Sequence, residues 1–352
     1  MSTCDVNSPA VVAAPTTHLF VGSGRDKPLN TQLRLGEVVA VLETDDTKPG
    51  WTRVRAAWGL AHEDQPGVTE GWVESAALLA ADSSDAAACY AARLEPALRS
   101  ALSLGAIDAN LHPQRWLQVT ALAANLFAVP SRKRAPAECV LPSECWLAGL
   151  KQGECVDATA TSEDGWWNVL LPDGREFWVQ AGDVVADGLP ALDAQAIVGE
   201  ASRMLGRPYV WAGTSSFGYD CSGLTQMLAR RCGIGLPHLA DQHVQVRYPR
   251  LHPVGEDRTV AEVAAVARPP AGQMTPEFSA AAEAAKQRWG ALLQPGDFLY
   301  FSMNGRLNDH VGIWAGDGDM IHASSGGEPT TRRERLWGGK FAARMTAVRR
   351  VV

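Results

Sequence analysis

One cysteine has the neighbours that nucleophilic catalysis needs. Cys221 stands in the stretch YVWAGTSSFGYDCSGL (Tyr209–Leu224), between an acidic residue and a hydroxyl, and a helical pattern starts directly after it. We expect the free N–H groups and the dipole of that helix to stabilise a thiolate and to lower the pKa of Cys221. Such a nucleophile needs a base within reach, and the base needs a group that orients it.

Two histidines lie on neighbouring strand-like segments further along the chain. His310 begins HVGIWAG, and His322 lies in the next segment, MIHAS. A hairpin that turns at residues 316–319 would bring them side by side. One imidazole could then face the thiol while the other holds the first in the required tautomer. Taken singly, each of the three residues is more often structural.

The elements around these residues read as an α+β domain that begins near Gly188. Helical patterns that end on glycines come first, and strand-like segments separated by Asn-Gly and Gly-Asp-Gly turns follow. The expected elements are two helices and then three strands, at 191–206, 222–233, 296–302, 310–316 and 320–324. Helices followed by an antiparallel sheet predict one α+β domain over 188–352.

The first half of the chain is a β-rich segment that occurs twice. Short strands punctuated by Gly, Pro and Asp predict two small all-β barrels, at 10–81 and 119–187. GEVVAVLET, GWTRVRA and EGWVESAALL match GECVDATAT, GWWNVLL and REFWVQAGDVV, and both copies open on Leu-Phe. The Ala/Leu-rich segment 82–118 predicts a connector of one or two helices, jointed at Pro96.

Composition excludes some kinds of partner. A net charge of −7 over 352 residues argues against nucleic acid. No apolar run approaches the ~18 residues of a membrane span. The first residues lack the pattern of a signal peptide, so we expect a cytoplasmic protein. Seven cysteines at irregular spacing argue against a disulfide framework. Cys139, Cys145 and Cys155 lack the paired spacing of structural zinc, and we expect no metal.

The blocks around the cysteine and histidines resemble the NlpC/P60 cysteine peptidases. GRPYVWAGTSSFGYDCSGLTQ, LPHLADQ, LQPGDFLYF and DHVGIWAGDGDMIHAS occur in the order of that family and cover about 191–352. The resemblance implies a papain-like α+β fold. The two upstream barrels resemble bacterial SH3 (SH3b) domains. The combination is similar to enzymes of murein peptide recycling, which cleave the bond between γ-D-glutamate and a diamino acid.

The resemblance also implies roles for single residues. Cys221 would be the nucleophile, His310 its base and His322 the residue that orients the base. Tyr209 matches a tyrosine near the nucleophile, whose hydroxyl helps to bind the oxyanion. The N–H of Cys221 is the other natural donor.

Two neighbours of the nucleophile match positions that bind substrate. Asp220 and Ser222 would hold the free amino terminus of the peptide. A buried carboxylate needs a cationic partner, and an ammonium group would serve.

The chain departs from the family pattern at three places. His238 follows the proline where the family often has arginine, so it is a second candidate base. Ala212-Gly213 replaces the usual Gly-Gly after the tryptophan. An insertion over 247–287 contains an alanine-rich helix, and a cover, a partner surface or a plain surface excursion would each explain it.

The implied function is a cysteine peptidase without metal or cofactor. It would hydrolyse the γ-D-glutamyl to L-diamino acid bond (diaminopimelate or lysine) of murein peptides that have a free N-terminal L-Ala. One alternative is a secreted peptidoglycan hydrolase that cleaves stem peptides of the intact wall. An alternative of another class is a non-catalytic SH3b peptide-binding protein. That reading predicts a broken triad, whereas all three residues are present. We expect neither nucleic acid nor membrane as a partner.

Overall fold

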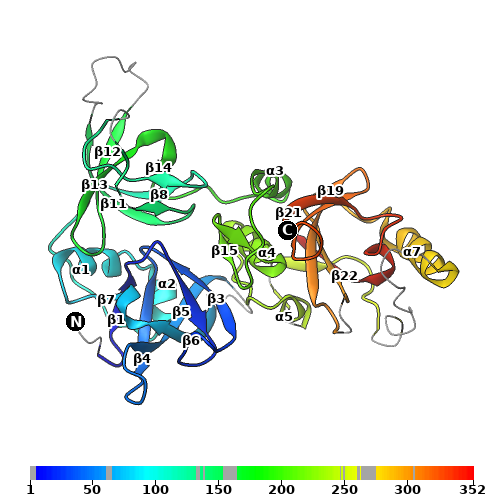
Figure 1. Ribbon diagram of the computed structural model, residues 1–352, viewed down its shortest axis with the longest axis horizontal. Coiled ribbons are helices and arrows are strands. Elements are labelled where there is room, and N and C mark those ends of the chain that lie inside the picture. The colour runs from blue at the N-terminus through cyan, green and yellow to red at the C-terminus, as the bar shows by residue number, and fades with distance from the viewer. Residues whose placement is uncertain are drawn as a thin grey trace. The chain divides into compact units, whose positions relative to one another are not determined.

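The computed structural model describes residues 5–60, 66–131, 135–137, 139–153, 165–245, 247–248, 250–259, 262, 275–303 and 306–352 (Figure 1). The chain divides into two compact units. The first holds residues 1–58, 68–190 and 215–217, and the second holds 59–67, 191–214 and 218–352. Among the described residues, no helix is both long and apolar enough to cross a membrane.

The first sheet of unit 1 is open, although it surrounds a core. Its seven strands are β1 (Pro9–Val12), β2 (Thr16–Phe20), β3 (Leu29–Arg34), β4 (Val38–Thr44), β5 (Trp51–Leu60), β6 (Pro66–Glu74) and β7 (Leu78–Ala80). Their order is β3-β2-β6-β5-β4-β1-β7. Apolar side chains from along this order, such as Leu33, Val54 and Leu78, meet in one cluster. Burial of these side chains therefore shapes the sheet without a ladder between the edge strands β3 and β7.

The second sheet of unit 1 is also open. Its strands are β8 (Arg115–Val119), β11 (Trp146–Gly153), β12 (Trp166–Leu170), β13 (Glu176–Gln180) and β14 (Val184–Ala186). They run in the order β13-β12-β11-β8-β14, and β9 (Ala124–Asn125) pairs separately with β10 (Val140–Leu141). The predicted β character is confirmed for both copies. The prediction of closed barrels is wrong for the described strands.

Equivalent aromatic residues support the internal repeat. In the first copy Phe20 pairs with Trp72 across two strands and meets Trp51 edge-on, with ring centroids 5.2 Å apart. The second copy repeats this geometry at 5.1 Å with Phe127, Trp178 and Trp166. Edge-to-face pairs are a preferred aromatic arrangement. The two copies therefore share a packing motif as well as a sequence pattern.

The counterpart of β4 in the second copy is not the segment that the sequence repeat indicated. β4 pairs with β1 on one side and with β5 on the other, and β11 pairs in the same way with β8 and β12. The structural counterpart of β4 is therefore 146–153. The match of GEVVAVLET to GECVDATAT was wrong, because the recurring Gly-Glu pair is not in the equivalent strand. Residues 154–161 of that stretch lie outside the described residues.

Two short helices link the copies, as predicted. α1 (Asp85–Ala92) is capped by Ser84, and α2 (Pro96–Ala101) begins at the proline. The hydroxyl of Tyr90 donates to the carbonyl of Leu170 at 2.7 Å and accepts from the N–H of Ala148 at 3.1 Å. Satisfying a buried hydroxyl in this way allows the ring to stay in the core. The connector thus packs against the second copy.

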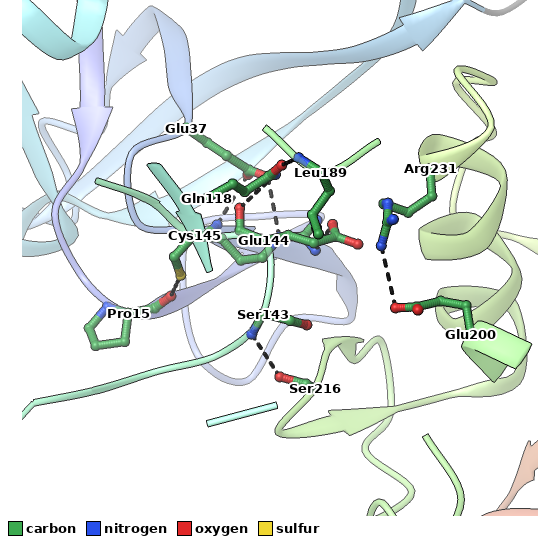
Figure 2. A network of polar contacts seen from close by, with 11 residues as sticks. Pro15, Glu37, Gln118, Ser143, Glu144, Cys145, Leu189, Glu200, Ser216 and Arg231 are labelled. Carbon is green, nitrogen blue, oxygen red and sulfur yellow. Dashed lines mark hydrogen bonds and ion pairs between the residues drawn. The ribbon is translucent and has the colours of Figure 1, made fainter. Parts of the chain in front are cut away.

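Polar contacts join the two copies where their strands meet. Figure 2 shows Cys145 donating to the carbonyl of Pro15, and Gln118 bonded to Glu144 and Leu189. The guanidinium of Arg34 lies 2.8 Å from the carboxylate of Glu144, and both side chains are buried. Because a buried charge is costly unless it is paired, this ion pair fixes the relative register of the copies.

Unit 2 is built on a six-stranded antiparallel sheet. Its strands are β17 (Leu251–Pro253), β18 (Phe298–Phe301), β19 (His310–Gly316), β20 (Asp319–Ser324), β21 (Thr330–Arg335) and β22 (Met345–Val351), in the order β17-β22-β18-β19-β20-β21. Before the sheet come α3 (Ala196–Arg203), β15 (Thr214–Ser215), β16 (Gly218–Tyr219), α4 (Cys221–Arg231) and α5 (Ala240–Gln245). The predicted antiparallel sheet is present, whereas the predicted order of helices and then strands holds only in part, because β15 and β16 lie between α3 and α4.

Helix α4 is held between the sheet and α3. It packs against β19 and β20. On its other side Arg231 lies 3.3 Å from Glu200 of α3 (Figure 2). Eight of its residues are buried, including the polar Ser222, Thr225 and Gln226. A helix fixed in this way presents its first residue, Cys221, at a set position on the sheet.

The segment 247–287 is part of the domain and not an excursion from it. Strand β17 extends the sheet beside β22. Helix α7 (Pro276–Trp289) places Phe278 and Ala282 against Ala342 and Ala343, and Trp289 is fully buried. Residues 263–274 lie outside the described residues. The described part of the insertion contributes side chains to the hydrophobic core. None of the three expectations for the insertion included such a role.

Candidate active site

Asp220 fixes the start of helix α4 and therefore the place of Cys221. Its Oδ1 accepts from the N–H of Gly223 at 2.6 Å and from the hydroxyl of Ser222 at 3.2 Å. Its Oδ2 accepts from the N–H of Ala212 at 2.8 Å. An aspartate N-cap satisfies backbone donors that the helix leaves free and favours its positive end. The cap also ties the preceding loop to the first turn.

The loop beneath the cysteine is packed too tightly for side chains. A Cβ on Gly223 would lie 1.9 Å from the carbonyl oxygen of Gly213, so this contact requires glycine. Ala212 adopts a positive φ of 58°. That conformation suits the glycine usual at this position in the family, and it costs alanine about 1 kcal/mol. The N–H of Ala212 on Asp220 holds it there.

A tight hairpin brings His310 and His322 together. Strands β19 and β20 are joined through Asp317 and Gly318, which both have positive φ, as a type I′ turn requires. A Cβ on Gly312 would lie 3.2 Å from the Cβ of His322, so glycine leaves room for that imidazole. The Nε2 of His310 is 2.8 Å from the Nδ1 of His322.

A carboxylate extends this pair and determines where its protons lie. The Nε2 of His322 is 3.1 Å from Oε2 of Glu334, which also accepts from Arg332 at 3.0 Å. A carboxylate can only accept, so His322 carries its proton on Nε2 and its Nδ1 is an acceptor. His310 must then donate from Nε2. Its Nδ1 keeps the free lone pair that a general base needs.

Glu334 was not predicted from the sequence. It lies on β21, the strand beside β20, where Arg332 is the residue paired with His322. Alternation along the strand puts Glu334 on the same face. The available signal was a single acidic residue in TTRRER, the strand that follows the histidine hairpin. The contact of Glu334 with His322 depends on the register between β20 and β21, and residue spacing in the sequence does not determine that register.

The thiol lies next to the histidine strand. The backbone N–H groups of Val311, the residue after His310, and of Ser222 donate to the sulfur of Cys221. Burial and, to a smaller extent, the charge of Asp220 nevertheless raise the pKa of Cys221 to about 12. The expected lowering by the helix terminus is therefore wrong in direction, because desolvation outweighs these hydrogen bonds.

The base is neutral for the same physical reason. Burial lowers the pKa of His310 well below its usual value, and the neighbouring His322, Lys340 and Arg332 lower it further. Burial also lowers the pKa of His322, whereas Glu334 opposes this. Thiol and imidazole therefore rest as a neutral pair. Such a pair can react when the imidazole takes the proton as the sulfur attacks.

Tyr209 lies close enough to Cys221 for the two to interact electrostatically, and its hydroxyl is hydrogen-bonded to Ser325. Burial raises the pKa of Tyr209, so its hydroxyl keeps its proton. A protonated phenol and the N–H of Cys221 are both donors of the kind that stabilise an oxyanion.

His238 contacts the helix cap. Its Nε2 is 2.8 Å from Oδ2 of Asp220, its side chain is 5% exposed, and its Nδ1 is buried without a hydrogen bond. Asp220 thus has four hydrogen-bond partners, and Ser222 is engaged with it. His310, and not His238, is the imidazole whose neighbour contacts the thiol. Binding of an amino terminus by Asp220 and Ser222 stays a prediction.

The described cysteines outside the site lie in the core or against it. The described cysteines, Cys89, Cys139, Cys145, Cys221 and Cys232, are free thiols. Cys155 lies outside the described residues, and within them no three His, Cys, Asp or Glu side chains are grouped as metal ligands.

We expect His310→Ala to slow alkylation of Cys221 by iodoacetamide about tenfold or more at pH 7. A thiol with a raised pKa is almost entirely protonated there, and the variant lacks the base that removes the proton. Its rate should then rise steadily as the pH approaches about 10. Mass spectrometry of each cysteine peptide measures the rates, with Cys89 and Cys232, whose pKa values burial raises to about 11, as slow references. Equal rates in both proteins would contradict the coupling.

A second substitution tests the carboxylate. Glu334→Gln keeps the size and the acceptor oxygen but removes the charge that stabilises protonated imidazoles. The alkylation rate of Cys221 at pH 7 should fall about three- to tenfold, since one pKa unit corresponds to a factor of ten. Asp319→Asn, which removes a carboxylate paired with Arg335 on the neighbouring strand, is the matched control. If both variants lose the same amount, Glu334 has no specific role.

Known proteins resemble this chain in sequence and fold. Residues 206–350 match the model of the NlpC/P60 family. The chain is 29% identical to a γ-D-glutamyl-L-lysine dipeptidyl-peptidase of Bacillus cereus over 164 residues, 45% of this chain and 38% of that protein. It is 30% identical to a γ-DL-glutamyl hydrolase of Bacillus subtilis over 178 residues, 49% of this chain and 32% of that protein. It thus spans well under half of these relatives.

The fold likeness covers more of the chain than the sequence likeness does. The crystal structure of an NlpC/P60 family protein from Bacillus cereus aligns over 98% of this chain and 99% of its own, with a TM-score of 0.63 and 20% identity. At that identity the likeness concerns the fold. The site residues from Tyr209 to Glu334 lie inside the matched range, and residues 206–350 are therefore an NlpC/P60 domain.

Proposed function

We propose that this protein is a cysteine peptidase that hydrolyses the bond between γ-D-glutamate and an L-diamino acid in murein peptides with a free N-terminal L-Ala. The observation that carries the proposal is the chain of contacts from His310 through the buried His322 to Glu334, beside a thiol at a helix start. The names of the two relatives, which specify γ-glutamyl bonds, support the substrate class.

The first half of the reaction uses the base lone pair directly. The sulfur of Cys221 attacks the γ-carbonyl carbon while Nδ1 of His310 takes the thiol proton. The imidazolium is stabilised through His322 by the charge of Glu334. The N–H of Cys221 and the hydroxyl of Tyr209 donate to the oxyanion. As the tetrahedral intermediate collapses, His310 returns the proton to the leaving amine, and a thioester remains.

The second half regenerates the enzyme. His310 takes a proton from water, and the resulting oxygen nucleophile attacks the thioester carbonyl. The sulfur leaves and is protonated by His310, which releases the L-Ala-γ-D-Glu product. His310 accepts and then donates a proton in both halves of the reaction. The same nitrogen must be free at the start of each half, so the tautomer of neutral His310 must be fixed.

Asp220 and Ser222 are proposed to hold the ammonium group of the N-terminal L-Ala. For Asp220 this means that the ammonium takes the place of His238 on Oδ2, because its other bonds maintain the helix cap. An ammonium group can form a charge-assisted hydrogen bond with this carboxylate in place of the imidazole. N-acetylation removes that charge and should abolish the exchange.

We expect release of diaminopimelate from L-Ala-γ-D-Glu-meso-diaminopimelate, quantified by chromatography. Cys221→Ala should reduce the rate by about a thousandfold or more, since the variant has no nucleophile. The N-acetylated peptide should be cleaved at least about tenfold more slowly than the free one.

The same experiment separates the other functions. Cleavage of acetylated peptide or of intact sacculi at the same rate would favour a hydrolase of the wall and contradict the proposed cytoplasmic, recycling role. Binding of the peptides without any cleavage would favour the non-catalytic peptide-binding protein.

A further inference from the structure

An exposed lysine lies next to the catalytic imidazoles. The ammonium of Lys340 is 4.9 Å from the ring centroid of Phe341. That ring is stacked on His310, with centroids 5.6 Å apart, and meets His322 edge-on at 5.1 Å. Lys340 therefore lies one ring away from the base that the proposed mechanism uses.

The charges that face the two histidines do not balance. Arg332 and Glu334 of β21 are paired with each other at 3.0 Å. Lys340, in the loop after β21, has no carboxylate partner among the described residues, and its ammonium contacts the ring of Phe341. The charged groups around the imidazoles thus leave one positive charge in excess, in a protein whose net charge is −7.

This excess charge opposes the proposed reaction unless the substrate compensates for it. His310 must become cationic as the thiol is deprotonated, and a cation nearby raises the free energy of that state. A substrate anion beside Lys340 would remove this penalty. The compensation would be present only when the correct substrate is bound, which makes it a source of specificity.

The position of the anion follows from what His310 does. Its proton passes to the leaving nitrogen, so the groups nearest to His310 belong to the diamino acid. The carbon bonded to that nitrogen carries a carboxylate when the diamino acid is C-terminal. In a longer peptide the same carbon carries a neutral amide.

We propose that Lys340 is a specificity-determining residue that binds the α-carboxylate of the leaving diamino acid. The proposal rests on the proposed function and refines its substrate class: peptides that end at the diamino acid, rather than longer stem peptides, are the preferred substrates.

The test compares L-Ala-γ-D-Glu-L-Lys with the same peptide carrying a C-terminal amide, in the full-length protein. We expect the wild type to prefer the free acid at least about tenfold in kcat/KM. Lys340→Met should lower kcat/KM for the acid about tenfold, and it should not lower that for the amide, because the variant also lacks the charge that opposes the imidazolium. Arg333→Met is the matched control. Arg333 is an exposed cation on β21, and it is not among the charges that shift His310 or His322.

A readout without substrate accompanies this comparison. The ratio of Cys221 alkylation by anionic iodoacetate to that by neutral iodoacetamide should fall severalfold in Lys340→Met and stay unchanged in Arg333→Met. Equal cleavage of the acid and the amide by the wild type would overturn the inference, and so would an alkylation ratio that is the same in the wild type and in Lys340→Met. Neither result would contradict the proposed peptidase activity. If neither peptide is cleaved, the proposed function fails, and the alkylation ratio alone decides whether Lys340 attracts anions.

Discussion

The hydrogen bond between Nε2 of His310 and Nδ1 of His322 is the interaction on which the site depends. It is 2.8 Å long, and both rings are packed against Phe341. The bond has a direction only because Glu334 accepts from the far side of His322. Without that carboxylate, either tautomer of the pair would satisfy the same geometry. A carboxylate on a neighbouring strand thus determines which nitrogen is available to the thiol.

The surrounding fold maintains this arrangement by burial and by small residues. Gly312 leaves space for one imidazole, and Gly213 and Gly223 let the loop approach the helix that carries Cys221. Burial also makes both reacting groups reluctant to ionise. Reactivity in this setting therefore depends on the charged residues that surround the imidazoles. Glu334 stabilises the imidazolium form of His310, and Lys340 destabilises it. A substrate carboxylate beside Lys340 would offset the destabilising charge.

The sequence was sufficient for the parts of the site that depend on local patterns. The Asp-Gly turn and the alternating strands predicted that His310 and His322 would meet, and the helical pattern after Cys221 predicted α4. The same patterns could not reveal Glu334 or Lys340, because their contacts depend on strand register and on a loop. The direction of the Cys221 pKa shift was also beyond reach, since a helix terminus is visible in the sequence and burial is not.

The two β regions in the first half of the chain show the same limit of prediction from local sequence patterns. Matching segments predicted two equivalent β regions, and Phe20 and Phe127 of the two Leu-Phe pairs do make equivalent contacts. Closure of the sheets and the true counterpart of β4 depend on which strands pair, and residue patterns alone misplaced both. The SH3b assignment of these regions stays a prediction.

The central claim is the position of the protons along the chain from His310 to Glu334. Long-range ¹H–¹⁵N NMR of protein labelled at histidine measures it directly, with His310→Ala and His322→Ala for assignment. The account predicts that both histidines carry their proton on Nε2, and that Nδ1 of His310 has the chemical shift of an unprotonated nitrogen at neutral pH. A proton on Nδ1 of neutral His310 would contradict it, because that nitrogen could then not accept the proton of Cys221.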